Sequence, residues 1–155
     1  HKFRIYMKDF FIYVRNYFFD SIGKFFFIVL WICNTIGISW QFIKSETLIN
    51  AFRKIDRKDF VLLEEQDIPY LDTALQIGYG QTISQPYVVA FMLELLELEP
   101  ANKVLDIGSG SGYTTALISQ SIGKIGYVFG LEKIPALVEF GKQNLKKYEK
   151  IYLEF

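Results

Sequence analysis

The pattern of apolar and charged residues changes once along the chain, close to residue 43. From Phe25 to Ile43 the sequence contains no charged side chain, and aromatic and aliphatic residues crowd together throughout residues 1–43. From Ser45 onward, apolar residues recur at spacings typical of amphipathic helices and short strands. We therefore expect an aromatic-rich N-terminal segment, residues 1–43, followed by a globular domain, residues 44–155.

Three interpretations of residues 1–43 remain open. A membrane anchor needs about 20 mostly apolar residues, and residues 25–43 are long enough, with Lys8, Arg15 and Lys24 on one side. The same stretch also suits an amphipathic or buried helix packed on the domain. A third interpretation is translated upstream sequence, because Phe, Ile, Tyr, Asn and Lys are the residues that AT-rich codons encode.

Two helices are expected before the first strand of the domain. Ser45 is placed to cap a helix whose apolar face consists of Leu48, Ile49, Phe52 and Ile55. A second helix is expected over residues 85–97, and its apolar side consists of Val88, Val89, Met92 and Leu96. Pro100 and Asn102 mark the turn that follows.

Beyond this turn, strands and helices alternate. Short apolar strands are expected at residues 103–107 and 126–131, and a third begins at residue 151. The connecting helices run from Tyr113 to Ser121 and from Pro135 to about Tyr148. This order predicts a doubly wound, Rossmann-like α/β fold with a parallel sheet.

Charge and composition exclude several classes of function. Lys and Arg together number 17, as do Asp and Glu, so no strong field directs the chain toward nucleic acid. The single cysteine, Cys33, excludes an internal disulfide and a cysteine-based zinc site, and it permits the cytoplasm. The single histidine is His1, so the domain has no histidine base and no metal site is predicted.

The strongest chemical signal is the loop after the first of these strands. Residues 106–112 read Asp-Ile-Gly-Ser-Gly-Ser-Gly, with Gly108, Gly110 and Gly112 at alternate positions around Ser109. Glycines let the backbone turn sharply and approach a ligand closely. The helix that follows directs unpaired N–H groups toward that ligand. The loop is therefore a candidate cofactor-binding site.

Acidic residues around the loop distinguish two classes of cofactor. A nicotinamide dinucleotide site has the spacing G-x-G-x-x-G, whereas here the third glycine comes one residue earlier and is followed by Tyr113. Asp106 precedes the loop as in methyltransferases, and Glu132 ends the next strand, where its carboxylate can accept hydrogen bonds from both ribose hydroxyls of an adenosine. S-adenosyl-L-methionine is the cofactor we infer. The alternative is a plain strand–helix turn with a solvated Glu132.

Residues 78–86 carry a more specific pattern, Gly-Tyr-Gly-Gln-Thr-Ile-Ser-Gln-Pro. This segment resembles the G-x-x-x-T-I-S-x-P segment of the protein-L-isoaspartate O-methyltransferase family in content, in order and in distance to Gly108. The resemblance covers roughly residues 44–150. Its supporting matches are Phe52-Arg53, Asp59-Phe60 and residues 110–113.

The resemblance implies an enzyme that repairs damaged proteins. Such enzymes transfer a methyl group from S-adenosyl-L-methionine to the α-carboxylate of isoaspartyl residues in proteins or peptides. The ester then cyclises to a succinimide without the enzyme, and reopening regenerates some normal aspartate. The acceptor carboxylate is already a nucleophile at neutral pH, since carboxyl pKa values lie near 4. No general base is needed, and in-line positioning is the protein's task.

The resemblance also implies roles for the residues of this segment. Ser84 corresponds to the active-site serine of the family, whose hydroxyl would orient the acceptor carboxylate. Gln81, Thr82 and Ile83 would help to line the cleft for cofactor and substrate. The alternative for Ser84 is an N-cap of the helix that begins near Pro86.

The family fold has a larger sheet than this sequence supplies. We therefore expect a fragment, incomplete at its C-terminus, with an uncovered apolar sheet, poor stability and little activity. Two other functions stay open. One is a methyltransferase with a different acceptor, and the other is a non-catalytic, membrane-anchored chain that retains the cofactor fold. The sequence does not indicate the oligomeric state.

Overall fold

A computed structural model describes residues 43–148 and 151–154, the last strand by its backbone alone. Residues 1–42, nearly all of the expected N-terminal segment, lie outside the described residues, so the three interpretations of that segment remain predictions. None of the helices in the described part is long and apolar enough to cross a bilayer.

A parallel sheet in the order β3-β4-β5 forms the centre of the fold. Its strands are β3 (Lys103–Ile107), β4 (Tyr127–Leu131) and β5 (Ile151–Glu154), which confirms the strands expected from the sequence. Lys103 pairs with Tyr127 and Ile107 with Leu131, so β3 and β4 end at the same edge. Open parallel sheets bind their ligands outside this carboxyl edge.

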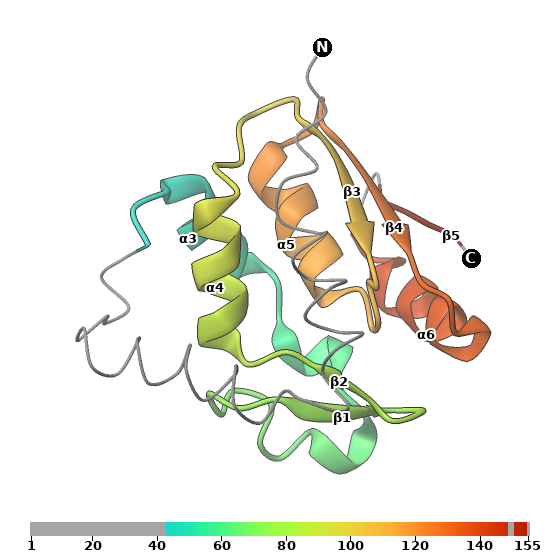
Figure 1. Ribbon diagram of the computed structural model, residues 1–155. Coiled ribbons are helices and arrows are strands. Elements are labelled where there is room, and N and C mark those ends of the chain that lie inside the picture. Colours follow the sequence, from blue (N-terminus) through green and yellow to red (C-terminus); the bar gives the residue numbers. More distant parts are fainter. Residues whose placement is uncertain (1–42, 149–150, 155) are drawn as a thin grey trace, which may run out of the picture. The chain divides into compact units, whose positions relative to one another are not determined.

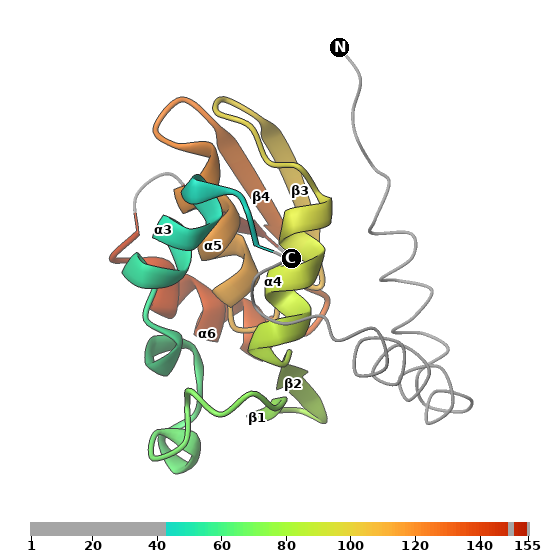
Figure 2. The same cartoon turned by 90° about the vertical axis from the view of Figure 1, so that its left-hand side faces the viewer.

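Two helices connect these strands. α5 (Tyr113–Ile122) joins β3 to β4, and α6 (Pro135–Leu145) joins β4 to β5, with Pro135 in its first turn as expected. Both helices lie on the same side of the sheet (Figures 1 and 2), as right-handed crossovers require when strand order follows chain order. α6 ends before the expected Tyr148, whose amide closes a tight turn on the Leu145 carbonyl at 2.8 Å.

α3 (Glu46–Lys54) begins as the sequence predicts. The Ser45 hydroxyl accepts a hydrogen bond from the Leu48 amide at 3.4 Å and so satisfies an N–H group of the first turn. Leu48 and Ala51 are buried where α3 packs against α5 and α4.

α4 spans Pro86–Leu95, inside the predicted range, but its buried face differs from the expected one. Tyr87, Val89, Ala90 and Leu93 are buried, whereas Val88 and Met92 are only half-buried. The expectation was right for Val89 and wrong for Val88 and Met92, because nearly every residue of α4 is apolar and Glu94 is its single charge. Periodicity therefore cannot locate the face that packs.

An antiparallel hairpin precedes α4 and was not expected from the sequence. Its strands are β1 (Leu75–Gly78) and β2 (Gln81–Ile83). Two short 3₁₀ helices, η2 (Arg57–Phe60) and η3 (Leu63–Glu65), come before the hairpin. The hairpin and η2 carry residues of the candidate site.

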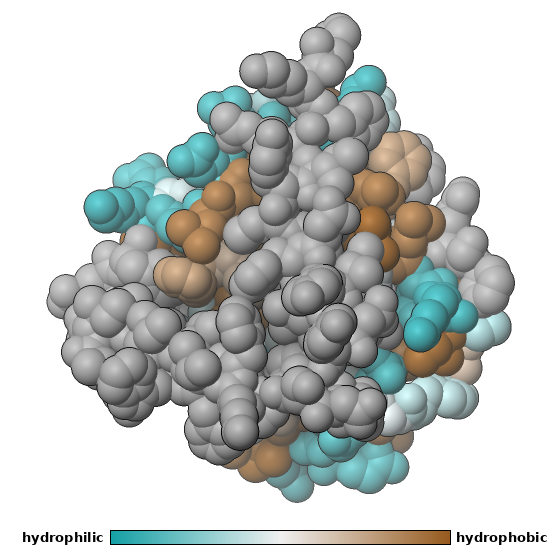
Figure 3. Space-filling view, viewed as in Figure 1, coloured by the Kyte–Doolittle hydropathy of each residue, from teal (hydrophilic) through white to brown (hydrophobic). Residues whose placement is uncertain are grey.

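The two faces of the parallel sheet differ in exposure. Toward the helices, Val128 of β4 is fully buried and belongs to the same hydrophobic core as Leu117 of α5. On the opposite face, Leu105, Tyr127 and Phe129 are 37, 42 and 46% exposed. Apolar side chains gather at the molecular surface over this sheet (Figure 3). Among the described residues, the helices thus lie on one face of the sheet, and the expectation of an incomplete fold stays a prediction.

Candidate cofactor and acceptor site

The glycine loop joins β3 to α5 at the carboxyl edge of the sheet. Gly108, Gly110 and Gly112 have φ angles of 80, 57 and 88°, which residues with a side chain rarely adopt. A Cβ at Gly110 would lie 3.1 Å from Cδ1 of Ile77, and one at Gly112 would lie 2.9 Å from Cδ1 of Leu145. The loop therefore needs glycine for its backbone conformation and for its close packing against β1 and α6.

The end of β4 holds this loop in place. The amides of Gly108 and Ser109 both donate to the Leu131 carbonyl, at 2.6 and 3.1 Å. The buried Ser109 hydroxyl donates to the same carbonyl at 3.1 Å. Ser109 thus stabilises the loop itself, and its expected contact with a cofactor stays a prediction.

Glu132 closes the loop from the strand next to it. The side chain is 2% exposed. Its Oε2 accepts a hydrogen bond from the Gly110 amide at 2.9 Å, and its Oε1 accepts one from the Ile134 amide at 3.1 Å. Each carboxylate oxygen has capacity for a second hydrogen bond. The arrangement is compatible with the predicted ribose contacts of Glu132.

Asp106 points into the protein rather than along the loop. Its carboxylate is 5% exposed, and Oδ2 accepts a hydrogen bond from the Thr115 hydroxyl of α5 at 2.6 Å. This bond ties the end of β3 to the first turns of the helix that follows the loop. Asp106 thus stabilises the loop, and its expected part in binding a cofactor stays a prediction.

The residues of the 78–86 segment differ in accessibility. Thr82 is exposed and Gln81 is half-buried, with its amide group donating to the Gly80 carbonyl at 3.1 Å. Ile83, by contrast, is 4% exposed and belongs to the hydrophobic core. Of the three residues expected to line the cleft, Gln81 and Thr82 therefore have accessible side chains.

Ser84 follows β2 and is half-buried. The N-cap position of α4 is occupied by Gln85, whose side chain makes no capping hydrogen bond, so the alternative role of Ser84 as N-cap is wrong. The Asp72 carboxylate serves that end of the helix instead, since its Oδ1 accepts from the Tyr87 amide at 2.8 Å. Within residues 43–148, no hydrogen bond engages the Ser84 hydroxyl.

Sequence reasoning missed Arg57, which contacts this segment from η2. The side chain is 3% exposed, and its guanidinium donates to the carbonyls of Pro69, Ser84 and Thr73. Burial lowers the pKa of Arg57 from its ordinary value. A lone arginine in a polar stretch reads as a surface residue, so the sequence offers no signal of this role.

Tyr113, the first residue of α5, lies over Arg57 with the guanidinium carbon 5.3 Å from its ring centre. Burial raises the pKa of this phenol to about 12. Arg57 and Tyr113 also border an open pocket of about 160 Å³. The other residues around this pocket are Phe52, Ile55, Tyr70 and Pro86.

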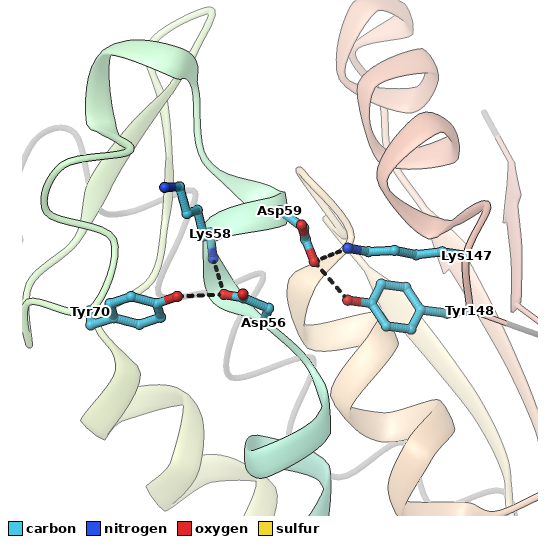
Figure 4. Close-up of polar contacts among 6 residues, drawn as sticks. All are labelled: Asp56, Lys58, Asp59, Tyr70, Lys147 and Tyr148. Carbon is cyan, nitrogen blue, oxygen red and sulfur yellow. Dashed lines mark hydrogen bonds and ion pairs between the residues drawn. The ribbon is translucent and has the colours of Figure 1, made fainter.

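Charged contacts fix η2 between the loop before β1 and the end of α6 (Figure 4). Asp59 forms an ion pair with Lys147 and accepts a hydrogen bond from the Tyr148 hydroxyl at 3.0 Å. Asp56 accepts from the Tyr70 hydroxyl at 2.8 Å. Burial raises the pKa of Tyr148, and its hydrogen bond to Asp59 acts in the same direction. These contacts hold the helix that carries Arg57.

A glycine loop between a parallel strand and its helix, closed by a carboxylate from the next strand, defines the Rossmann-like fold of S-adenosylmethionine-dependent methyltransferases. The sequence model of the protein-L-isoaspartate(D-aspartate) O-methyltransferase family matches residues 35–155. The chain belongs to this family.

The relatives found by sequence and those found by structure carry the same family name. The chain is 44% identical over 106 residues to the protein-L-isoaspartate O-methyltransferase of Methanosarcina mazei, an alignment that covers 68% of this chain and 44% of that protein. It is 48% identical over 101 residues to protein-L-isoaspartate O-methyltransferase 1 of Archaeoglobus fulgidus, covering 65% of this chain and 47% of that protein. The chain therefore spans about half the length of the curated relatives it matches.

A crystal structure of the Plasmodium falciparum protein-L-isoaspartate O-methyltransferase, in complex with S-adenosyl-L-homocysteine, aligns with a TM-score of 0.64 and 30% identity. That alignment covers 81% of this chain and 60% of the Plasmodium chain. A second protein-L-isoaspartate O-methyltransferase structure aligns with a TM-score of 0.63 and 27% identity, over 80% of this chain and 39% of that one.

Proposed function

We propose that this chain provides the cofactor loop and the acceptor-orienting serine of an enzyme that methylates the α-carboxylate of L-isoaspartyl residues in damaged proteins. One observation carries the proposal. The segment that distinguishes the family, residues 78–86, continues from a strand whose Ile77 packs directly against Gly110 of the glycine loop. The serine segment and the cofactor loop thus belong to one packed unit.

The residues of the loop fit S-adenosyl-L-methionine. Glycine at positions 108, 110 and 112 permits close approach of a ligand to the backbone. The first turn of α5 directs N–H groups to the same edge, and Glu132 offers a buried acceptor for hydroxyl groups. When bound, this cofactor would supply an electrophilic methyl group.

The chain's own residues would position the acceptor. The isoaspartyl carboxylate is ionised at neutral pH and attacks without loss of a proton, so the domain's lack of a histidine base is no obstacle. The Ser84 hydroxyl, which makes no hydrogen bond within residues 43–148, would donate one to a carboxylate oxygen. Transfer would form a carbon–oxygen bond as the methyl–sulfur bond breaks, leaving S-adenosyl-L-homocysteine, and its rate would depend on how the acceptor is aligned.

The proposed partners are isoaspartyl-containing proteins or peptides, and the proposed location is the cytoplasm. Balanced charge provides no attraction to nucleic acid. Names of the matched relatives favour the isoaspartyl acceptor over another acceptor and over a non-catalytic chain.

A calorimetric titration of S-adenosyl-L-homocysteine into the full chain tests the cofactor site. We expect saturable binding that Glu132→Gln weakens by about tenfold or more, because a hydrogen bond to a charged group is lost. Glu139→Gln, the same change at an exposed position of α6, is the matched control. Methyl transfer is then measured on two peptides of one sequence, with isoaspartate or normal aspartate. Equal methylation of both peptides, or of neither, would refute the proposal.

A further inference from the structure

We infer that Arg57 is the positioning residue of Ser84, holding its main chain in a fixed relation to the start of α5. This inference rests on the proposed function, in which the Ser84 hydroxyl orients the acceptor carboxylate. Arg57 acts through Ser84, because its guanidinium nitrogens donate to backbone carbonyls.

The guanidinium group connects three separate pieces of backbone. Nε donates to the Pro69 carbonyl at 2.8 Å, Nη1 to the Ser84 carbonyl at 2.8 Å, and Nη2 to the Thr73 carbonyl at 3.1 Å. Each nitrogen therefore has a different acceptor, and the planar fork fixes the directions of all three bonds. Hydrogen bonds from a charged donor are about twice as strong as neutral ones, and this donor is 3% exposed.

The segment that contains Ser84 is held from a second side. In the sequence, Asp72 lies between Pro69 and Thr73, whose carbonyls accept from Arg57. Its Oδ1 accepts from the Tyr87 amide at 2.8 Å. Its Oδ2 accepts from the Gln85 side-chain amide at 3.1 Å. Arg57 thus fixes the Ser84 carbonyl. Asp72, which lies in the loop that Arg57 also contacts, fixes Gln85 and Tyr87. The Ser84 side chain is left to project from a restrained backbone.

Arg57 also links this segment to the cofactor loop. The Tyr113 ring lies 5.3 Å from the guanidinium carbon, and Tyr113 directly follows Gly112. Displacing the guanidinium would uncouple the Ser84 backbone from the residue that follows the loop. Since in-line transfer depends on sub-ångström alignment of the acceptor with the methyl donor, this coupling affects turnover more than cofactor affinity.

Lysine cannot replace these contacts. Its ammonium is a point charge on a flexible stem and lacks the rigid fork of the guanidinium. Arg57→Lys therefore retains the charge and removes the geometry. Arg53→Lys, on an exposed position of α3, makes the same chemical change away from the site and is the matched control.

Backbone amide hydrogen exchange of the full chain tests the positioning without any need for activity. We expect Arg57→Lys to speed exchange of the Tyr87 amide by about tenfold, the effect of losing a charge-assisted bond, and to leave α6 unchanged. Arg53→Lys should change neither region. An equal increase in both regions would show that Arg57 only stabilises the whole domain, and no increase would show that it restrains nothing; either result overturns the inference.

A kinetic double-mutant cycle separates positioning from general stability. For an isoaspartyl peptide, we expect Arg57→Lys to lower kcat by about tenfold and to leave the S-adenosyl-L-homocysteine Kd nearly unchanged. In a Ser84→Ala background the same substitution should have no further effect on kcat. Full additivity of the two losses would overturn the inference. Absence of methyl transfer in the unmodified chain would count against the proposed function alone, because hydrogen exchange still decides the role of Arg57.

Discussion

At the scale of single residues, a hydrogen bond between Asp106 and Thr115 connects the strand before the glycine loop to the helix after it. Both side chains are buried, at 5 and 0% exposure, and their hydrogen bond is 2.6 Å long. Thr115→Val retains the shape and removes a donor to a buried carboxylate, which costs about 1–3 kcal/mol. We expect the free energy of unfolding, measured in urea, to fall by that amount.

The neighbouring Thr114 provides the control for this change. Thr114 is only half-buried, so Thr114→Val should change stability by less than about 0.5 kcal/mol. Equal effects of the two substitutions would contradict the idea that the Asp106–Thr115 bond is what stabilises the loop.

Tyr113 makes stability depend on pH in the alkaline range. Burial raises its pKa to about 12, although the charge of Arg57 acts in the opposite direction. The folded protein keeps the phenol protonated after the unfolded chain begins to ionise near pH 10. The stabilisation that comes from the protonated Tyr113 phenol is therefore fully present below about pH 10 and is lost as the pH rises toward 12.

Tyr113→Phe should reduce that alkaline loss of stability, and Tyr148, whose pKa burial also raises, accounts for part of what remains. The measurement is the urea midpoint at several pH values between about 9 and 11. Tyr79→Phe, at the exposed tip of the hairpin, is the matched control. If Tyr113→Phe left the slope of stability against pH unchanged, the buried phenol would not be its source.

At the scale of elements, the glycine loop depends on the helix packed beneath it. Gly112 and Gly80 both have positive φ angles, of 88 and 67°. A Cβ at Gly80 meets nothing within 4 Å, whereas one at Gly112 comes within 2.9 Å of Leu145 in α6. Alanine at either position costs about 1–2 kcal/mol from the backbone alone.

Gly112→Ala should therefore destabilise the protein more than Gly80→Ala, by a further 1–3 kcal/mol or so for the clash. Urea unfolding of both variants measures this difference. Adding Leu145→Ala should recover part of the excess, because it removes the atoms that the new Cβ meets. A purely additive effect of Leu145→Ala would indicate that the clash is relieved elsewhere.

The sequence predicted the elements that turn residues bound clearly and missed those without such bounds. β3 and β4 were expected almost to their ends as short apolar runs, and α5 as the helical pattern between them. The hairpin of β1 and β2 escaped because its strands are short and its turn relies on the left-handed φ of Tyr79, 55°. Its residues were still singled out by the motif.

The site was predicted where a motif carries it and missed where tertiary contacts create it. Gly108, Gly110 and Gly112 have the backbone that their residue type indicates. Arg57 comes from η2, and its acceptors lie 12, 16 and 27 positions away. No local pattern encodes such a contact, because three distant carbonyls converge only once the chain has folded.

At the scale of the molecule, the two faces of the sheet should respond differently to polar substitutions. Leu105 and Tyr127 project from the face opposite the helices and are 37 and 42% exposed, whereas Val128 on the other face is fully buried. Exposed apolar surface of this kind promotes association. We expect the chain to associate as its concentration rises, and Leu105→Gln with Tyr127→Gln to weaken that association.

Sedimentation measures the association, and urea unfolding of the same samples measures stability. The paired substitution should change the free energy of unfolding little, because both side chains keep much of their surface in water. Val128→Gln should unfold the domain, since it buries an amide in the core without a partner. If the paired substitution unfolded the chain as Val128→Gln does, the face would already be packed in solution. The sheet would then be covered on both sides, as a doubly wound fold requires.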